Sequence, residues 1–147
     1  MELFDALKLE NQLCFPLYAA SRMVVRQYRP YLDALDLTYT QYIVMMVLWV
    51  EGKISVKDLG EKLYLDSGTL TPVLKSMEKK GFISRYRSSE DERVLIAELT
   101  DKGRAIQADA ASVPEKMASC IQLEQQEAGE LYTLLYKILE MLQADQR

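Results

Sequence analysis

Apolar side chains recur every three or four residues along most of this chain, which is the spacing of helices that bury one face. The first such segment covers about residues 6–28, with an apolar face formed by Leu13, Leu17, Ala20 and Val24. Pro30 biases the residue before it away from helical dihedrals, so we expect the helix to end near this proline. Pro16 lies inside the segment, and we expect it to loosen the backbone there by leaving the carbonyl of Gln12 without its helical partner.

The second segment, about residues 38–52, is apolar along most of its length. Its run 43–50 has the composition of a buried strand, but the length of the segment between capping signals favours a buried helix. Thr38 or Thr40 would cap the N-terminus of this helix, and Gly52 would end it.

Two shorter amphipathic segments follow, and a turn separates them. The first, residues 55–63, opens with Ser55 and an acidic residue three positions later, an arrangement similar to a capping box. The second runs through SGTLTPVLKSMEKK to Gly81, a residue type that commonly ends helices. Because proline is tolerated best in the first turn of a helix, Pro72 indicates that this helix begins late, near Thr69.

The pattern then changes to the two-residue alternation of strands. Residues 83–87 and 95–99 form the arms of a predicted hairpin, and the polar segment SSEDE lies at its tip. Two further helices are expected, one in TDKGRAIQADAASV and one in LEQQEAGELYTLLYKILEMLQADQ. The last helix carries an apolar stripe over about three turns, formed by Leu131, Leu134, Leu135, Ile138, Leu139 and Leu142.

This order of elements gives the expected fold class, mainly α with a small β-hairpin (α+β). Residues of about 38–100 are expected to form a winged helix-turn-helix, which is a DNA-binding arrangement. The helices of about 1–30 and 101–147 carry more apolar surface than a small winged domain needs. They either cover each other within one chain or build the interface of a homodimer. A protein that binds palindromic operator DNA needs two-fold symmetry, so we expect these flanking helices to be dimerisation helices.

Composition argues against several kinds of function. The chain has no histidine, so it lacks an imidazole for general base catalysis, and its two cysteines are too few for a usual structural zinc site. We therefore expect no enzymatic activity, metal or cofactor. The N-terminus lacks the signature of a signal peptide, and no apolar run reaches the roughly 18 residues that span a bilayer. A cytoplasmic protein with no membrane partner is expected, and in that compartment thiols stay reduced.

Charge is distributed unevenly along the chain. The net charge of −4 argues against binding nucleic acid through bulk charge, but residues 52–93 carry nine basic and seven acidic side chains between two net acidic regions. A locally basic segment on an acidic scaffold suits a nucleic-acid site. The second short helix offers side chains that can bond phosphates or base edges, namely Ser67, Thr69, Thr71 and Lys75.

The predicted hairpin adds further candidates for contacts to DNA. Arg85 and Arg87 lie on its first arm, and Arg93 lies beside its tip, where an arginine can enter a narrow minor groove. Alternatively, Arg93 forms an ion pair with Asp91 that only braces the hairpin. Both can hold at once if Asp91 aims the Arg93 side chain.

Two stretches of this middle region resemble MarR-type transcriptional regulators. SSEDERVLIAELTDKG resembles their wing, in which an Asp-x-Arg pair, here Asp91 and Arg93, precedes a strand that ends in Leu-Thr. LDSGTLTPVLKSMEKKGFI resembles their recognition helix. Within this family, LENQLCFPLYAASR and LTYTQYIVMMVLW resemble the OhrR group of peroxide-sensing repressors.

This resemblance implies a homodimeric repressor in which organic hydroperoxides oxidise Cys14. It also implies that Tyr28 and Tyr39 of the partner subunit hydrogen-bond the sulfur of Cys14. Some members of the group have only the sensing cysteine and form mixed disulfides with small thiols, whereas others have a second cysteine that forms a disulfide between subunits. Cys120 lies in the region comparable to that second cysteine, so the chain resembles the two-cysteine type. The alternative for Cys120 is a small buried apolar side chain.

The chemistry of a sensing cysteine sets further requirements. A thiolate attacks peroxide oxygen, so tyrosine hydroxyls or a nearby helix N-terminus would have to stabilise the Cys14 anion. The resulting sulfenic acid condenses with a thiol, and bridging Cys14 to Cys120 requires α carbons within about 7 Å. We expect this movement to change the spacing of the recognition helices and abolish operator binding. Two other interpretations are a ligand-responsive repressor with a structural Cys14 and a thiol peroxidase.

Overall fold

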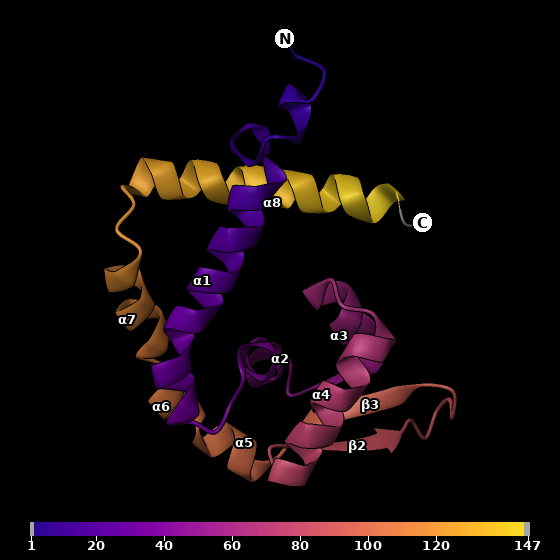
Figure 1. Cartoon of the computed structure of the whole chain (residues 1–147). Coiled ribbons are helices and arrows are strands. Elements are labelled where there is room, and N and C mark those ends of the chain that lie inside the picture. Colours follow the sequence, from indigo (N-terminus) through magenta and orange to yellow (C-terminus); the bar gives the residue numbers. More distant parts are fainter. Residues whose placement is uncertain (1, 146–147) are drawn as a thin grey trace.

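The computed structural model describes residues 2–145 and is built mainly from helices (Figure 1). Two short 3-10 turns, Asp5–Leu7 and Leu9–Asn11, precede the first long helix. The elements that follow are α1 (Cys14–Asp33), α2 (Tyr39–Glu51), β1 (Lys53–Ser55), α3 (Val56–Leu63), α4 (Ser67–Lys80), β2 (Ile83–Arg87), β3 (Leu95–Leu99), α5 (Asp101–Ala105), α6 (Gln107–Ala110), α7 (Val113–Cys120) and α8 (Gln125–Asp145). The expected fold class is confirmed, since α3, α4 and the β2–β3 hairpin form a winged helix-turn-helix.

The sheet has three antiparallel strands in the order β1-β3-β2. The predicted hairpin is correct, and its register pairs Ile83 with Leu99. The third strand, β1, was not predicted, because a strand of three residues has too short a pattern to recognise. It pairs with β3 through Ile54 opposite Ala97, which is fully buried. The sheet therefore joins the start of the helix-turn-helix to the wing.

Helix α2 is the centre of the core, as its apolar sequence predicts. Met45 and Leu48 have no exposed surface, and the buried side chains around them come from α3, α4 and the start of β2: Leu59, Leu70, Leu74, Met77 and Ile83. The N-cap is Thr38, whose hydroxyl accepts from the backbone N–H of Gln41 at 3.2 Å. The backbone N–H of Thr38 in turn donates to the Gln41 side chain at 3.1 Å, which completes a capping box.

Helix α1 differs from the expectation at both ends. It begins at Cys14, so Pro16 lies in its first turn, where a missing N–H costs nothing because these groups have no helical partner. The expected effect of Pro16 on Gln12 is therefore wrong, since Gln12 is extended and lies outside the helix. The helix also continues through Pro30 to Asp33, which places Leu32 in the core. Burial of this last turn outweighs the backbone hydrogen bond that Pro30 removes.

Helix α4 begins at Ser67 rather than near Thr69, so the expected late start is wrong. Asp66 caps it by accepting from the backbone N–H of Thr69 at 2.7 Å. Pro72 lies inside the helix and removes the usual donor to the carbonyl of Gly68, but that carbonyl belongs to an exposed residue that water can reach. The expected end at Gly81 is confirmed, with the left-handed φ of 87° that favours glycine.

The C-terminal region contains more helices than expected. The single helix expected in TDKGRAIQADAASV is two short helices, α5 and α6, and the sequence pattern did not indicate α7, which packs on α1. Helix α8 lies at the opposite end of the molecule from α5 in Figure 1. Several of its apolar side chains are exposed, namely Leu131, Tyr132, Leu134, Tyr136, Met141 and Leu142. Leu135, Ile138 and Leu139 are half-buried. Within the residues that the structure describes, α7 thus covers part of α1, whereas the apolar side of α8 is left largely exposed. Among the helices of residues 2–145, none combines the length and hydropathy that crossing a bilayer requires.

Candidate functional site

The turn between α3 and α4 sets the angle of the helix-turn-helix. Tyr64 adopts the left-handed conformation with φ of 56°, and the backbone N–H of Leu65 donates to the carbonyl of Gly60 at 3.0 Å. A side chain at residue 60 would come within 2.7 Å of the Leu65 carbonyl oxygen, so this close approach requires glycine. The hydrogen bond from the Thr69 backbone holds the pKa of Asp66 below its usual value. The N-terminus of α4 is thus fixed at the surface.

Among the predicted residues of α4, Ser67, Thr71 and Lys75 share one face at four-residue spacing, and Thr69 lies on another face. Leu70, Leu74 and Met77 face the core, so Ser67, Thr69 and Lys75 are exposed. Thr71 is half-buried, and its hydroxyl donates to the carbonyl of Ser67 at 2.7 Å. Hydroxyl and ammonium groups in this arrangement can bond the phosphates and base edges of a DNA groove.

The tip of the β2–β3 hairpin presents a fixed cation. Arg93 makes two hydrogen bonds to the Asp91 carboxylate, from Nε to Oδ1 and from Nη2 to Oδ2, each at 3.0 Å. This pairing lowers the pKa of Asp91 and raises that of Arg93. The Arg93 side chain nevertheless remains 90% exposed, so the ion pair and an outward-facing guanidinium occur together.

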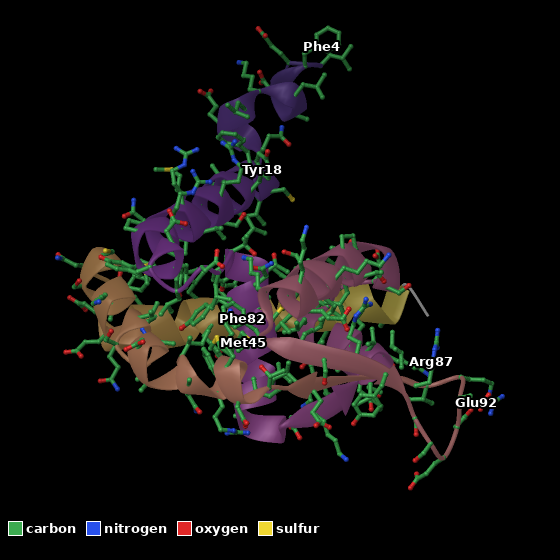
Figure 2. All side chains as sticks on the ribbon, turned by 90° about the horizontal axis from the view of Figure 1, so that it is seen from below. Phe4, Tyr18, Met45, Phe82, Arg87 and Glu92 are labelled. Carbon is green, nitrogen blue, oxygen red and sulfur yellow. The ribbon has the colours of Figure 1, made fainter. Side chains whose placement is uncertain are left out.

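The two other arginines of the hairpin differ from each other. Arg87 is exposed near the wing tip, where Figure 2 shows it beside the projecting loop that carries Glu92. Arg85 instead pairs with Glu78 of α4 at 3.3 Å, and its side chain is only 16% exposed. Its backbone N–H also donates to Glu78, at 3.1 Å. This placement favours Arg85 as a brace between β2 and α4 over Arg85 as a contact to DNA.

Cys14 is an exposed free thiol at the first residue of α1. The dipole of the helix favours negative charge at this end. Tyr28 lies fourteen residues further along the same helix, which corresponds to about 21 Å. A hydrogen bond between Cys14 and Tyr28 of one chain is therefore impossible in this structure, and only a second chain can bring the two together.

Tyr28 and Tyr39 form one aromatic cluster, in which their ring centroids lie 4.9 Å apart. Tyr42 completes the cluster at 5.8 Å from Tyr28 and 6.2 Å from Tyr39. Burial raises the pKa of all three phenols, and the neighbouring rings raise it further, so their hydroxyls stay protonated and can donate. Sequence reasoning missed Tyr42, although its spacing of three residues places it beside Tyr39 on α2.

Cys120 is an exposed free thiol at the end of α7, so the alternative of a buried apolar side chain is wrong. A hydrogen bond with Cys120 raises the pKa of Tyr31, which places this thiol beside the C-terminal part of α1. Cys14 lies at the opposite end of that helix, seventeen residues or about 25 Å from Tyr31. A disulfide requires α carbons within about 7 Å, so one chain cannot form it in this conformation.

Comparison with known proteins decides the family. The profile of the transcriptional regulator SarA/Rot family matches residues 26–110. The organic hydroperoxide resistance transcriptional regulator of Bacillus subtilis is 47% identical over 139 residues, which cover 95% of each chain. The chain belongs to the OhrR and SarA/Rot group of MarR-type transcriptional regulators.

Several solved structures of AbfR resemble the chain along most of its length. One of them is described as AbfR of Staphylococcus epidermidis. Reduced AbfR bound to DNA is 35% identical, with a TM-score of 0.79 over 97% of this chain and 98% of AbfR. Disulfide-formed AbfR is 37% identical, with a lower TM-score of 0.64 over 92% and 95% of the two chains. The conformation of this OhrR-type chain is thus more similar to the reduced form than to the disulfide form.

Proposed function

We propose that this regulator is a homodimeric, redox-controlled repressor that binds palindromic operator DNA in its reduced form and releases it after oxidation by an organic hydroperoxide. The names of its relatives support the oxidant, DNA binding and the disulfide, since one relative concerns resistance to organic hydroperoxides, and AbfR is described both as reduced and bound to DNA and in a disulfide form. The observation that carries the proposal is the position of Cys14, a free thiol at the start of α1 beside the exposed apolar side chains of Leu13, Phe15 and Leu17.

DNA binding is proposed for the outer side of α4 and for the tip of the hairpin. Helix α4 would enter the major groove with Ser67, Thr69, Thr71 and Lys75, and the wing would add Arg87 and Arg93. Asp91 would aim Arg93 toward the minor groove, and Arg85 would hold the wing against α4. A homodimer would present two such surfaces to the half-sites of a palindrome.

Sensing is proposed for Cys14 together with the tyrosine cluster of the partner subunit. The Cys14 thiolate would attack one oxygen of the hydroperoxide, the O–O bond would break, and the alkoxide would leave as an alcohol after taking a proton. Protonated phenols of the partner's Tyr28 and the partner's Tyr39 would donate hydrogen bonds to the sulfur. The sulfenic acid would then react with the thiol of the partner's Cys120, which forms a disulfide and releases water.

The test compares the wild type with Cys14→Ser and Cys120→Ser after treatment with cumene hydroperoxide. Operator affinity is measured by fluorescence anisotropy, and cross-linking is followed on non-reducing gels. The wild type should form a disulfide-linked dimer and lose operator affinity by at least about tenfold, whereas Cys14→Ser should do neither. Cys120→Ser should give no disulfide-linked dimer.

Loss of DNA binding by oxidised Cys14→Ser, equal to that of the wild type, would overturn the proposal. A ligand-responsive repressor with a structural Cys14 would instead keep its operator affinity after the treatment, in the wild type and in Cys14→Ser alike. The matched relatives are transcriptional regulators, and we infer that the protein is not an enzyme. Sustained consumption of cumene hydroperoxide in the presence of a thiol reductant would instead indicate a thiol peroxidase.

A further inference from the structure

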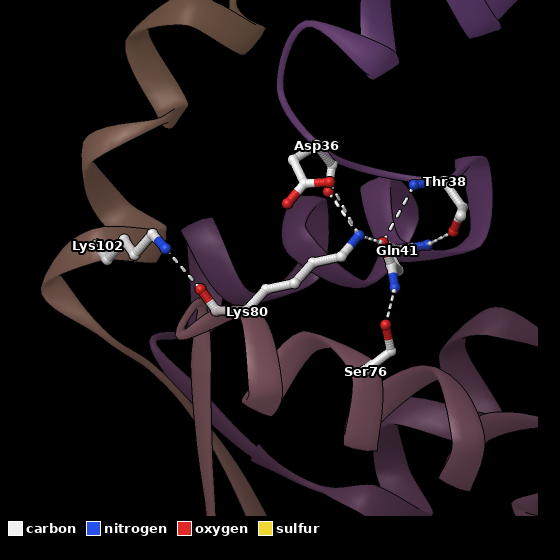
Figure 3. A network of polar contacts seen from close by, with 6 residues as sticks. All are labelled: Asp36, Thr38, Gln41, Ser76, Lys80 and Lys102. Carbon is white, nitrogen blue, oxygen red and sulfur yellow. Dashed lines mark hydrogen bonds and ion pairs between the residues drawn. The ribbon is translucent and has the colours of Figure 1, made fainter.

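A polar network joins the C-terminal half of the recognition helix to the start of α2. Figure 3 shows Lys80, the last residue of α4, reaching across to Asp36 and Gln41. The Lys80 ammonium donates to the backbone carbonyl of Asp36 at 2.7 Å and to Oε1 of Gln41 at 2.9 Å, and it lies 3.5 Å from the Asp36 carboxylate. The side chain is only 24% exposed, so these contacts are partly shielded from water.

Gln41 is the centre of this network. Gln41 is only 4% exposed, and apart from Tyr42 no other residue with a polar side chain is buried in the part of the chain that the structure describes. Oε1 accepts from the Thr38 backbone at 3.1 Å as well as from Lys80, so both of its lone pairs are used. Nε2 donates to the hydroxyl of Ser76 at 3.1 Å. A buried amide with these partners is costly to displace from any one of them.

The network holds α4 in a way that its apolar contacts do not. Leu70, Leu74 and Met77 pack against the core, but apolar contact is non-directional and leaves rotation of a helix weakly specified. Ser76 and Lys80 are four residues apart and therefore share one face of α4. Two directional contacts along that face fix the helix against α2. On the other side, the Lys80 carbonyl accepts from the ammonium of Lys102 in α5 at 2.6 Å.

Tyr39 connects this network to the proposed sensing site. It is the first residue of α2, between the N-cap Thr38 and Gln41, so it belongs to the same capped turn. Its ring packs on Tyr28 of α1 at 4.9 Å. A backbone displacement at Tyr39 that accompanied oxidation of the partner's Cys14 would move this turn, and Gln41 with it.

We propose that Gln41 and Lys80 are positioning residues that couple the tyrosine cluster to the recognition helix. This inference rests on the proposed redox function. It adds the contacts through which a change at the sensing site alters the orientation of α4. With the network intact, α4 takes one orientation when Tyr39 is in its reduced position and another when it is displaced. Without the network, α4 keeps its apolar packing, but its orientation no longer changes when the first turn of α2 moves.

The experiment compares Lys80→Met with Lys79→Met, which removes the same charge from the neighbouring residue. Lys79 is exposed on α4 and makes none of the network contacts. Operator affinity is measured before and after cumene hydroperoxide, and disulfide formation is followed in parallel. Coupled sites typically change each other's affinity by about 5- to 150-fold. The ratio of oxidised to reduced dissociation constants should fall at least about fivefold in Lys80→Met and less than about twofold in Lys79→Met, while disulfide formation proceeds at the wild-type rate in both.

Ser76→Ala is a second, milder variant, since it removes only the hydroxyl that accepts from Gln41. It should reduce the same ratio by about two- to threefold, and thermal unfolding followed by circular dichroism verifies that each variant is folded. A wild-type ratio in folded Lys80→Met and Ser76→Ala would overturn the coupling role while leaving the redox function intact. Absence of oxidative release in the wild type itself would overturn both.

Discussion

The carboxylate of Asp66 controls the first turn of the recognition helix. It accepts from the backbone N–H of Thr69 at 2.7 Å, and this hydrogen bond lowers its pKa in the folded protein. A group whose pKa is lower in the folded than in the unfolded state stabilises the fold above the unfolded value, about 3.9 for aspartate. That contribution disappears as the pH falls through the lowered folded value. The cap is thus sensitive to acid but fully formed at neutral pH.

Asp66→Ala should therefore lower the free energy of unfolding by about 1 kcal/mol at neutral pH, because one backbone donor of α4 loses its partner. Asp66→Asn is the matched control, since asparagine caps helices about as well and does not titrate. Urea unfolding at pH 7 and below pH 4 measures both effects. Asp66→Asn should stay near the wild type at pH 7 and lose less stability in acid. Equal stability of Asp66→Ala and the wild type would show that the cap contributes nothing.

Helix α5 locks the end of the recognition helix to the start of the wing. A side chain at residue 103 would clash with the carbonyl oxygen of Phe82 and approach Leu99 at 2.8 Å. The carbonyl of Gly103 also accepts from the indole N–H of Trp49 at 3.0 Å. Thr100 caps α5, and its hydroxyl donates to the carbonyl of Gly81 at the end of α4. Glycine is required at residue 103 because three elements meet there.

Gly103→Ala should lower the free energy of unfolding by about 1–3 kcal/mol, the usual cost of adding a methyl group to a packed site. Gly68→Ala is the control, because an added methyl group there meets no atom closer than 3.4 Å, and alanine is up to about 1 kcal/mol better than glycine in a helix. Denaturant unfolding of both variants decides the matter. The prediction fails if Gly103→Ala is as stable as Gly68→Ala.

Periodicity and capping signals predicted the elements whose stability is local. The N-cap Thr38, one of two candidates for α2, the N-cap Ser55 and the end of α4 at Gly81 all depend on residues close in sequence. Contacts between distant segments decided the rest. Strand β1 exists because it pairs with β3, and α1 passes Pro30 because Leu32 is buried at its end. Such tertiary contacts override a local preference and cannot be seen in a sequence pattern.

At the scale of the whole molecule, the sequence likewise predicted some parts of the candidate site and not others. The DNA-contact candidates on α4 and the wing follow one another in the sequence, so a local pattern located them. Resemblance to a family singled out Cys14 and Cys120, but no pattern indicates that they lie at opposite ends of α1. The Gln41–Lys80 contact joins residues 39 positions apart, and it became visible only in the folded chain. The proposed sensing site remains split until a second chain is present.

The exposed apolar side chains of α8 also indicate contact with a second chain. Leu134 is exposed within the chain and belongs to the apolar stripe of α8, whereas Thr133 lies on the polar side of the same helix. Leu134→Glu places a charge in the proposed interface and should give monomers in sedimentation velocity, with unchanged helix content by circular dichroism. Linking two binding units commonly increases affinity by about 10²- to 10⁴-fold, so operator affinity should fall by at least about 100-fold.

Thr133→Glu adds the same charge outside the stripe and should remain a dimer with operator affinity near that of the wild type. This control separates the loss of the interface from the general repulsion between DNA and an added acid. A dimeric Leu134→Glu that binds the operator as Thr133→Glu does would show that α8 does not hold the two subunits together. The apolar stripe would then need another partner, because exposed apolar surface of this extent marks a site of contact.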